Sequence, residues 1–129
     1  MEGDGGPAGA GVRVNPARPA PGTVLCRLDE LADPGAKSLY FEAWPAMFNG
    51  FVVRRGGEVF GYIDRCPHAA RPLAPIEDRY LTREKDLLLC SVHGALFRIE
   101  DGQCISGPCA GERLIRWPVV VDGEVVRAA

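Results

Sequence analysis

Two short motifs, Cys66-Pro67-His68 and Cys90-Ser91-Val92-His93-Gly94, decide the fold of this chain of 129 residues. The first motif is C-x-H, the second is C-x-x-H, and 21 residues separate them. They contain both histidines of the chain, and each follows a short apolar run that ends at Ile63 or Leu89. Because each histidine stands near a cysteine just after an expected strand, the pattern favours a metal centre built from two loops.

Two cysteines and two histidines suit either an iron–sulfur cluster or a zinc ion. Thiolates bind a sulfide-bridged di-iron unit, and imidazoles suit iron on the solvent side. Cys66, His68, Cys90 and His93 are therefore the candidate ligands of one 2Fe-2S cluster. A structural zinc module remains an alternative, although zinc ligands usually come as Cys-x-x-Cys with a separate pair of histidines. Buried cysteines beside incidental histidines are a third interpretation.

The rest of the chain favours an all-β fold with antiparallel strands. Short apolar runs alternate with turn signals, and no stretch keeps a helical apolar period for three turns. The glycines of Gly56-Gly57 are both expected to have positive φ, and Asp101-Gly102 and Asp122-Gly123 are further hairpin signals. The predicted strands cover residues 24–28, 51–55, 58–63, 87–89, 96–99, 103–105, 115–121 and 124–127, with a turn over 29–36.

Composition and length indicate one domain. Residues 1–22 are rich in Gly, Pro and Ala and are expected to form a flexible tail, or else an arm that packs on a partner, before a domain over 23–129. The first 20 residues lack the apolar core of an export signal, and no apolar run is long enough for a membrane anchor, so a cytoplasmic location is expected. The net charge of −2 argues against a nucleic-acid partner.

The pattern C-x-H…C-x-x-H-G between β strands resembles the Rieske domain, over about residues 24–129. Gly107-Pro108 falls where Rieske proteins have a proline-containing loop that covers the cluster. The resemblance implies the Rieske fold, with a smaller cluster-binding subdomain over about 66–108. It also implies that Cys66 and Cys90 bind the inner iron, and that His68 and His93 bind the outer iron.

Four positions differ from the Rieske proteins of respiratory complexes. Those proteins carry a disulfide between the two cluster loops, where this chain has Arg71 and Val92. They also place a serine and a tyrosine after the second histidine, where this chain has Ala95 and Phe97. The sequence therefore resembles the low-potential branch, the stand-alone ferredoxins of oxygenase systems.

This resemblance implies one-electron transfer. The expected partners are a flavin-containing reductase as donor and a terminal oxygenase, or another redox enzyme, as acceptor. No separate substrate site is expected, because an oxygenase needs a further mononuclear iron and both histidines are already used. The alternative is a small or regulatory subunit of a larger reductase, similar to nitrite reductase small subunits.

Three cysteines fall outside the motifs, namely Cys26, Cys104 and Cys109. They are expected to be free, buried thiols, although a local disulfide between Cys104 and Cys109 is conceivable. The large aromatic residues are expected to pack in the core rather than to carry electrons. They are Trp44, Phe48, Phe51, Phe60 and Trp117.

Overall fold

A computed structural model describes residues 15–67, 72–74, 78–90 and 94–129. Over these residues it contains one 3₁₀ turn, η1 (Leu28–Glu30), and three antiparallel sheets of three strands each, ordered β1-β9-β8, β2-β3-β4 and β5-β6-β7. The strands are β1 (Val24–Arg27), β2 (Gly35–Ala43), β3 (Ala46–Arg55), β4 (Glu58–Ile63), β5 (Leu87–Cys90), β6 (Ala95–Arg98), β7 (Cys104–Ser106), β8 (Val119–Asp122) and β9 (Val125–Ala128). The prediction of an all-β, antiparallel chain is confirmed. None of the described segments forms a helix long and apolar enough to span a bilayer.

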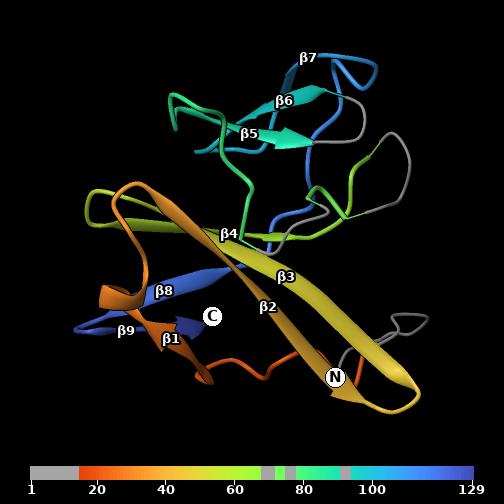
Figure 1. Cartoon of the computed structure of the whole chain (residues 1–129). Helices are drawn as coiled ribbons and strands as arrows, with labels where there is room; N and C mark the ends of the chain where they lie inside the picture. Colours follow the sequence, from red (N-terminus) through yellow and green to blue (C-terminus); the bar gives the residue numbers. More distant parts are fainter. Residues whose placement is uncertain (1–14, 68–71, 75–77, 91–93) are drawn as a thin grey trace.

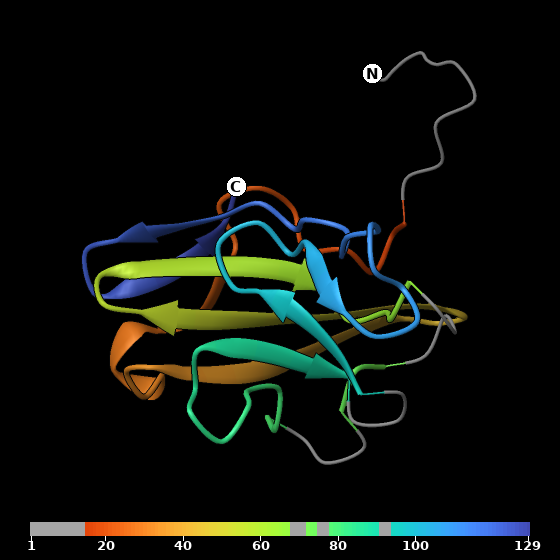
Figure 2. The same cartoon turned by 90° about the horizontal axis from the view of Figure 1, so that it is seen from above.

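The β2-β3-β4 sheet is the middle layer of the molecule. The β5-β6-β7 sheet lies on one side of it and the β1-β9-β8 sheet on the other (Figure 1), and Figure 2 shows the same strands from above. Because successive side chains of a strand point to opposite faces, Phe51 and Val53 enter the core facing the first sheet, whereas Phe48 and Val52 enter the core facing the second. Coverage of both faces explains why β3 is buried at four consecutive residues from Gly50 to Val53.

Trp117 is the centre of the second core. Its ring is 1% exposed and meets Phe48 edge-on at 4.9 Å between ring centroids. Two glycines make room for this segment. A Cβ at Gly50 would lie 2.6 Å from the Trp117 ring, and one at Gly61 would lie 2.4 Å from the Trp117 carbonyl oxygen. The Trp117 N–H also donates to the Gly61 carbonyl at 2.9 Å, so β4 and the chain before β8 touch through their backbones.

This close approach makes Gly61 a sensitive position. Gly61→Ala is expected to lower the free energy of unfolding by about 2 kcal/mol, because the new methyl group meets backbone that cannot move without breaking the bond between Trp117 and Gly61. Gly57→Ala is the matched control, since a Cβ there has no neighbour within 4 Å and its φ is not positive. Urea unfolding of both variants tests this, and equal free energies would contradict it.

The β2–β3 hairpin differs from the prediction. Strand β2 was not predicted, and β3 begins at Ala46 rather than at residue 51. These two strands pair along their whole length, from Gly35 with Arg54 to Ala43 with Ala46. Residues 35–43 form a strand because of this pairing, although their own strand signal is weak. The hairpin turn is Trp44-Pro45, so Trp44 is 79% exposed, and the expectation that it packs in the core is wrong.

Two smaller expectations also need correction. Gly56 has a φ of +66°, whereas Gly57 does not have a positive φ, so the turn needs only one left-handed residue. The strand predicted over 115–121 begins only at Val119, directly after Pro118, which has no N–H to donate to a sheet.

Residues 15–22, which the sequence places in the tail, pack on the domain. The Asn15 side chain donates to the Met47 carbonyl at 2.9 Å, and the Arg18 guanidinium lies 5.6 Å from the centre of the Phe48 ring. Ala17 is buried in the second core. Residues 1–14, the rest of the predicted tail, lie outside the described residues.

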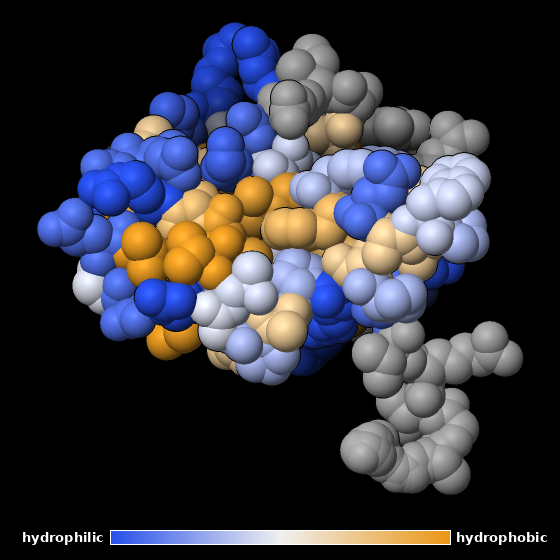
Figure 3. All heavy atoms as spheres, turned by 90° about the horizontal axis from the view of Figure 1, so that it is seen from below, coloured by the Kyte–Doolittle hydropathy of each residue, from blue (hydrophilic) through white to orange (hydrophobic). Residues whose placement is uncertain are grey.

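Hydrophobic side chains also gather on the face opposite the β5-β6-β7 sheet (Figure 3). Val24 and Val120 are about half exposed, and both lie in the β1-β9-β8 sheet, on either side of Arg127 in the register. Apolar residues interrupted by charged ones are common on protein surfaces. The face therefore needs no functional explanation.

Candidate metal centre

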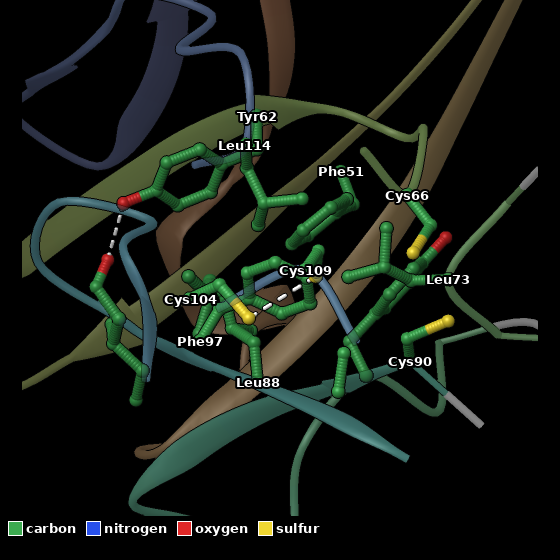
Figure 4. Packing of buried hydrophobic residues seen from close by; sticks show 14 residues of the cluster. Phe51, Tyr62, Cys66, Leu73, Leu88, Cys90, Phe97, Cys104, Cys109 and Leu114 are labelled. Atoms are coloured by element: carbon green, nitrogen blue, oxygen red, sulfur yellow. Dashed lines mark hydrogen bonds between the residues drawn. The ribbon is translucent and has the colours of Figure 1, made fainter. Parts of the chain in front are cut away.

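The two motif cysteines lie at the ends of strands from different sheets. Cys66 follows β4 by three residues, and Cys90 is the last residue of β5. Their side chains are 0% and 1% exposed and belong to the same core cluster. Figure 4 shows both thiols at one side of this cluster, with Leu73 beside them. Two segments far apart in the sequence therefore bring two shielded sulfur atoms to one end of the core.

His68 and His93 lie outside the described residues, as do Arg71 and Val92. The assignment of these histidines as ligands is therefore still a prediction. Within the described part of the chain, no group of three or more His, Cys, Asp or Glu side chains suits a metal ion. The two motifs consequently remain the place where a metal centre is expected.

The residues after the second motif lie directly against Cys90. Ala95 opens β6 and is paired with Cys90, and Phe97 is paired with Leu88. Both side chains are completely buried and neither carries a hydroxyl group. Gly107, with a φ of +103°, approaches Ala95 so closely that a Cβ would lie 2.7 Å from the Ala95 Cα. The segment that includes Pro108 therefore starts in close backbone contact with β6, the strand that follows the second motif.

A hydrogen-bonded carboxylate lies beside the first motif, and no local sequence pattern indicates it. Asp64 accepts the N–H of Leu73 at 2.8 Å and the hydroxyl of Tyr80 at 2.7 Å. Tyr80 is 2% exposed and its ring stacks on Phe51 with 4.2 Å between centroids. These partners are 9 and 16 residues from Asp64, so no short-range pattern joins them.

Cys104 and Cys109 form a buried pair of free thiols close to the motif cysteines. The Cys109 thiol donates to the Cys104 sulfur at 3.1 Å, and the Cys104 thiol donates to the Ser106 carbonyl at 3.3 Å. Burial is the main cause that raises the pKa of Cys109 to about 12, and Cys104 and then Cys66 contribute further. Figure 4 shows this pair inside the core cluster.

Both thiols are buried, and they are therefore expected to react slowly with alkylating reagents in the folded protein. Only the thiolate is a good nucleophile, and a pKa near 12 leaves Cys109 protonated at neutral pH. Mass spectrometry after alkylation of unreduced protein should find Cys104 and Cys109 unmodified when the protein is folded and both alkylated after unfolding. A disulfide would lower the mass of the peptide that contains both cysteines by about 2 Da relative to its dithiol form, because two hydrogen atoms are lost, and it would contradict the expectation.

The described residues fit the thiolate half of a Rieske cluster. Cys66 and Cys90 would supply two sulfur donors that are shielded from water to the inner iron of such a cluster. Leu73 and Ala95, both fully buried, provide an apolar surrounding that lowers the local dielectric. The other buried cysteine pair of this core differs in placement, because Cys104 begins β7 instead of following a strand.

Known structures share this fold. The ferredoxin of carbazole 1,9a-dioxygenase from Nocardioides aromaticivorans IC177 superposes with a TM-score of 0.64, at 24% identity, over 85% of this chain and 98% of that one. The ferredoxin of Sphingomonas yanoikuyae B1 superposes with a TM-score of 0.63, at 24% identity, over 83% of this chain and 96% of that one. The terminal oxygenase of carbazole 1,9a-dioxygenase from the same Nocardioides organism superposes with a TM-score of 0.68, at 20% identity. The superposition covers 87% of this chain and 30% of that one.

At these identities the superpositions show a common fold. Among curated protein sequences there is no match. The family model described as the Rieske [2Fe-2S] domain matches residues 23–121, which include both motifs and the whole described core between β1 and β8. The chain therefore belongs to the Rieske [2Fe-2S] domain family.

Proposed function

We propose that this chain is an electron carrier that uses one 2Fe-2S cluster held by Cys66, His68, Cys90 and His93. The observation that supports this most is the burial of Cys66 and Cys90 in one core cluster, at the ends of β4 and β5. When bound, a Rieske cluster takes up and releases a single electron. The chain supplies two thiolates from the core and, by the family pattern, two imidazoles.

The described residues around the thiols exclude water from the cysteine side of the centre. Leu73, Leu88 and Ala95 are all fully buried in the same core cluster as Cys66 and Cys90. A low dielectric at this side favours the cluster state of smaller net charge. Two ferric ions, two sulfides and two thiolates sum to zero, so the oxidised state is neutral and the environment disfavours the extra electron.

We further propose that the donor is a flavin-containing reductase and the acceptor a terminal oxygenase. The support comes from structural neighbours, among them a complex of reduced oxygenase and oxidised ferredoxin in carbazole 1,9a-dioxygenase, at 22% identity to this chain. A large reductase subunit that stays bound through purification would instead favour the small-subunit alternative. A cluster-binding subdomain over about 66–108 also remains part of this proposal.

Elemental analysis tests the cluster assignment. Protein purified without oxygen should contain about two irons and two acid-labile sulfides per chain, with little zinc. Stoichiometric zinc without sulfide would contradict the proposal and favour the structural zinc module.

We also propose a cytoplasmic location. The support is that the three cysteines outside the motifs, Cys26, Cys104 and Cys109, are free thiols, as is usual in a reducing compartment. Cell fractionation with antibodies against the chain tests this, and recovery in an exported fraction would contradict it.

A further inference from the structure

Asp64 connects the two ends of the segment that contains the first motif. Its carboxylate accepts the Leu73 N–H at 2.8 Å, so the residue two before Cys66 is held to the residue five after His68. Its own N–H donates to the Asn49 carbonyl of β3 at 3.0 Å. Asp64 is thereby anchored to the middle sheet while its side chain holds the far end of the segment.

Tyr80 connects Asp64 to the second motif. Its hydroxyl donates to the other carboxylate oxygen of Asp64 at 2.7 Å, and its backbone carbonyl accepts the Leu89 N–H at 2.8 Å. Leu89 immediately precedes Cys90 in β5. Stacking on Phe51 at an interplanar angle of 9° fixes the ring of Tyr80 in the core. A continuous path of hydrogen bonds therefore runs from the residue two before Cys66 to the residue before Cys90.

The bond between Asp64 and Tyr80 has the features of a strong interaction. Its acceptor is a carboxylate, its length is short, and the tyrosine is 2% exposed. Burial, followed by the hydrogen bond to Asp64, raises the pKa of Tyr80, so that the hydroxyl keeps its proton at any physiological pH. The hydroxyl therefore remains a hydrogen-bond donor toward Asp64 near neutral pH.

We propose that Asp64 and Tyr80 are positioning residues that hold Cys66 and Cys90 in the relative placement that the cluster requires. The inference rests on the proposed ligand set, but it concerns residues that the family pattern of cysteines and histidines does not include. Without the link, the described parts of the two segments keep the packing of their side chains in the core cluster but lose this hydrogen-bonded connection. The cluster would then be lost more easily and would vary more in geometry from molecule to molecule.

Tyr80→Phe is the direct test, because it removes the hydroxyl and keeps the ring that stacks on Phe51. Tyr62→Phe is the matched control. Tyr62 is also fully buried, and its hydroxyl also donates a hydrogen bond, to the Ile99 carbonyl at 2.5 Å, which leads to neither motif. Tyr80→Phe protein is expected to lose its cluster to an iron chelator about tenfold faster than the native protein, whereas Tyr62→Phe keeps the native rate. The electron paramagnetic resonance lines of reduced Tyr80→Phe should also be broader.

Asp64 variants provide the rescue series. Asp64→Asn keeps an oxygen that accepts the Leu73 N–H and a polar group opposite Tyr80, so its rate of cluster loss should lie between those of native protein and Asp64→Ala. If Asp64→Ala does not fold, the comparison of Asp64→Asn with Tyr80→Phe is sufficient. Unfolding of the cluster-free proteins separates a general loss of stability from a specific effect on the cluster.

The results distinguish this inference from the proposed function. A native protein that binds iron and sulfide, with Tyr80→Phe and Tyr62→Phe losing the cluster at the same rate, would overturn the positioning role alone. A native protein without iron and sulfide would overturn both. Faster loss in Tyr80→Phe only, with unchanged unfolding relative to Tyr62→Phe, would establish the positioning role.

Discussion

Cys66→Ser and Cys90→Ser are each expected to leave the protein without a normal 2Fe-2S cluster. A serine hydroxyl is a poor replacement for a thiolate on ferric iron, and each cysteine is one of the two proposed sulfur ligands. The affinity for iron should fall by more than the ~10–100-fold loss of metal affinity that follows removal of a group that only supports a metal ligand. Iron and sulfide analysis and the visible absorption spectrum measure this loss.

Cys26→Ser is the matched control for these variants. Cys26 is also buried, at 6% exposure, but it belongs to the second core with Trp117, away from the motifs. The same polar hydroxyl is therefore introduced into an apolar site without touching the cluster. Cys104→Ser and Cys109→Ser should likewise retain full iron content. Loss of iron in Cys26→Ser equal to that in Cys66→Ser would mean that general destabilisation, and not ligation, explains the result.

The reduction potential is expected to lie in the lower part of the Rieske range, at about −150 to −50 mV. Hydrogen bonds to the sulfurs stabilise the reduced, more negative cluster, and this chain has no hydroxyl at Ala95 or Phe97. Ala95 is paired directly with Cys90, so a donor here would lie next to a ligand. Arg71 and Val92 also exclude the disulfide of the high-potential proteins. A midpoint above about +100 mV would contradict the expectation.

Restoring the hydroxyls should raise the midpoint. Ala95→Ser and Phe97→Tyr add donors beside the second motif, whereas Phe48→Tyr adds the same phenol in the second core and should leave the potential unchanged. Protein-film voltammetry measures all three variants. The native potential should also be nearly flat from about pH 6 to 7.5, because the ligand histidines are expected to lose their protons only in alkali. A steep slope near pH 7, or no rise in Ala95→Ser and Phe97→Tyr, would count against this account of the tuning.

The sequence predicts where β4 and β5 end better than it predicts the β2–β3 hairpin. Strand β4 ends at Ile63, as predicted, and β5 ends at Cys90, one residue beyond the predicted Leu89, because a short apolar run before each motif marks these ends. Strand β2 is not visible in the same way, since Gly35–Ala43 mixes polar and apolar residues and depends on its pairing with β3. Trp44 is misassigned because composition favours burial of tryptophan, whereas the two-residue turn between Ala43 and Ala46 exposes it.

The link between Asp64 and Tyr80 could not be predicted for a different reason. Asp64 follows a strand and precedes a proline-containing motif, where an aspartate usually indicates only a turn. Its partners become neighbours only when β4 and β5 meet at one end of the core. These hydrogen bonds therefore depend on the tertiary structure. The sequence shows which residues could form them but not that they are neighbours.

Pulsed electron paramagnetic resonance of the reduced protein tests the ligand set most directly. If Cys66, His68, Cys90 and His93 hold the cluster, the spectrum should show a reduced 2Fe-2S centre with magnetic couplings to two nitrogen nuclei, one from each imidazole. His68→Cys and His93→Cys should each remove one of these couplings. A reduced centre without nitrogen couplings, or a protein with no paramagnetic signal that contains zinc, would contradict the assignment.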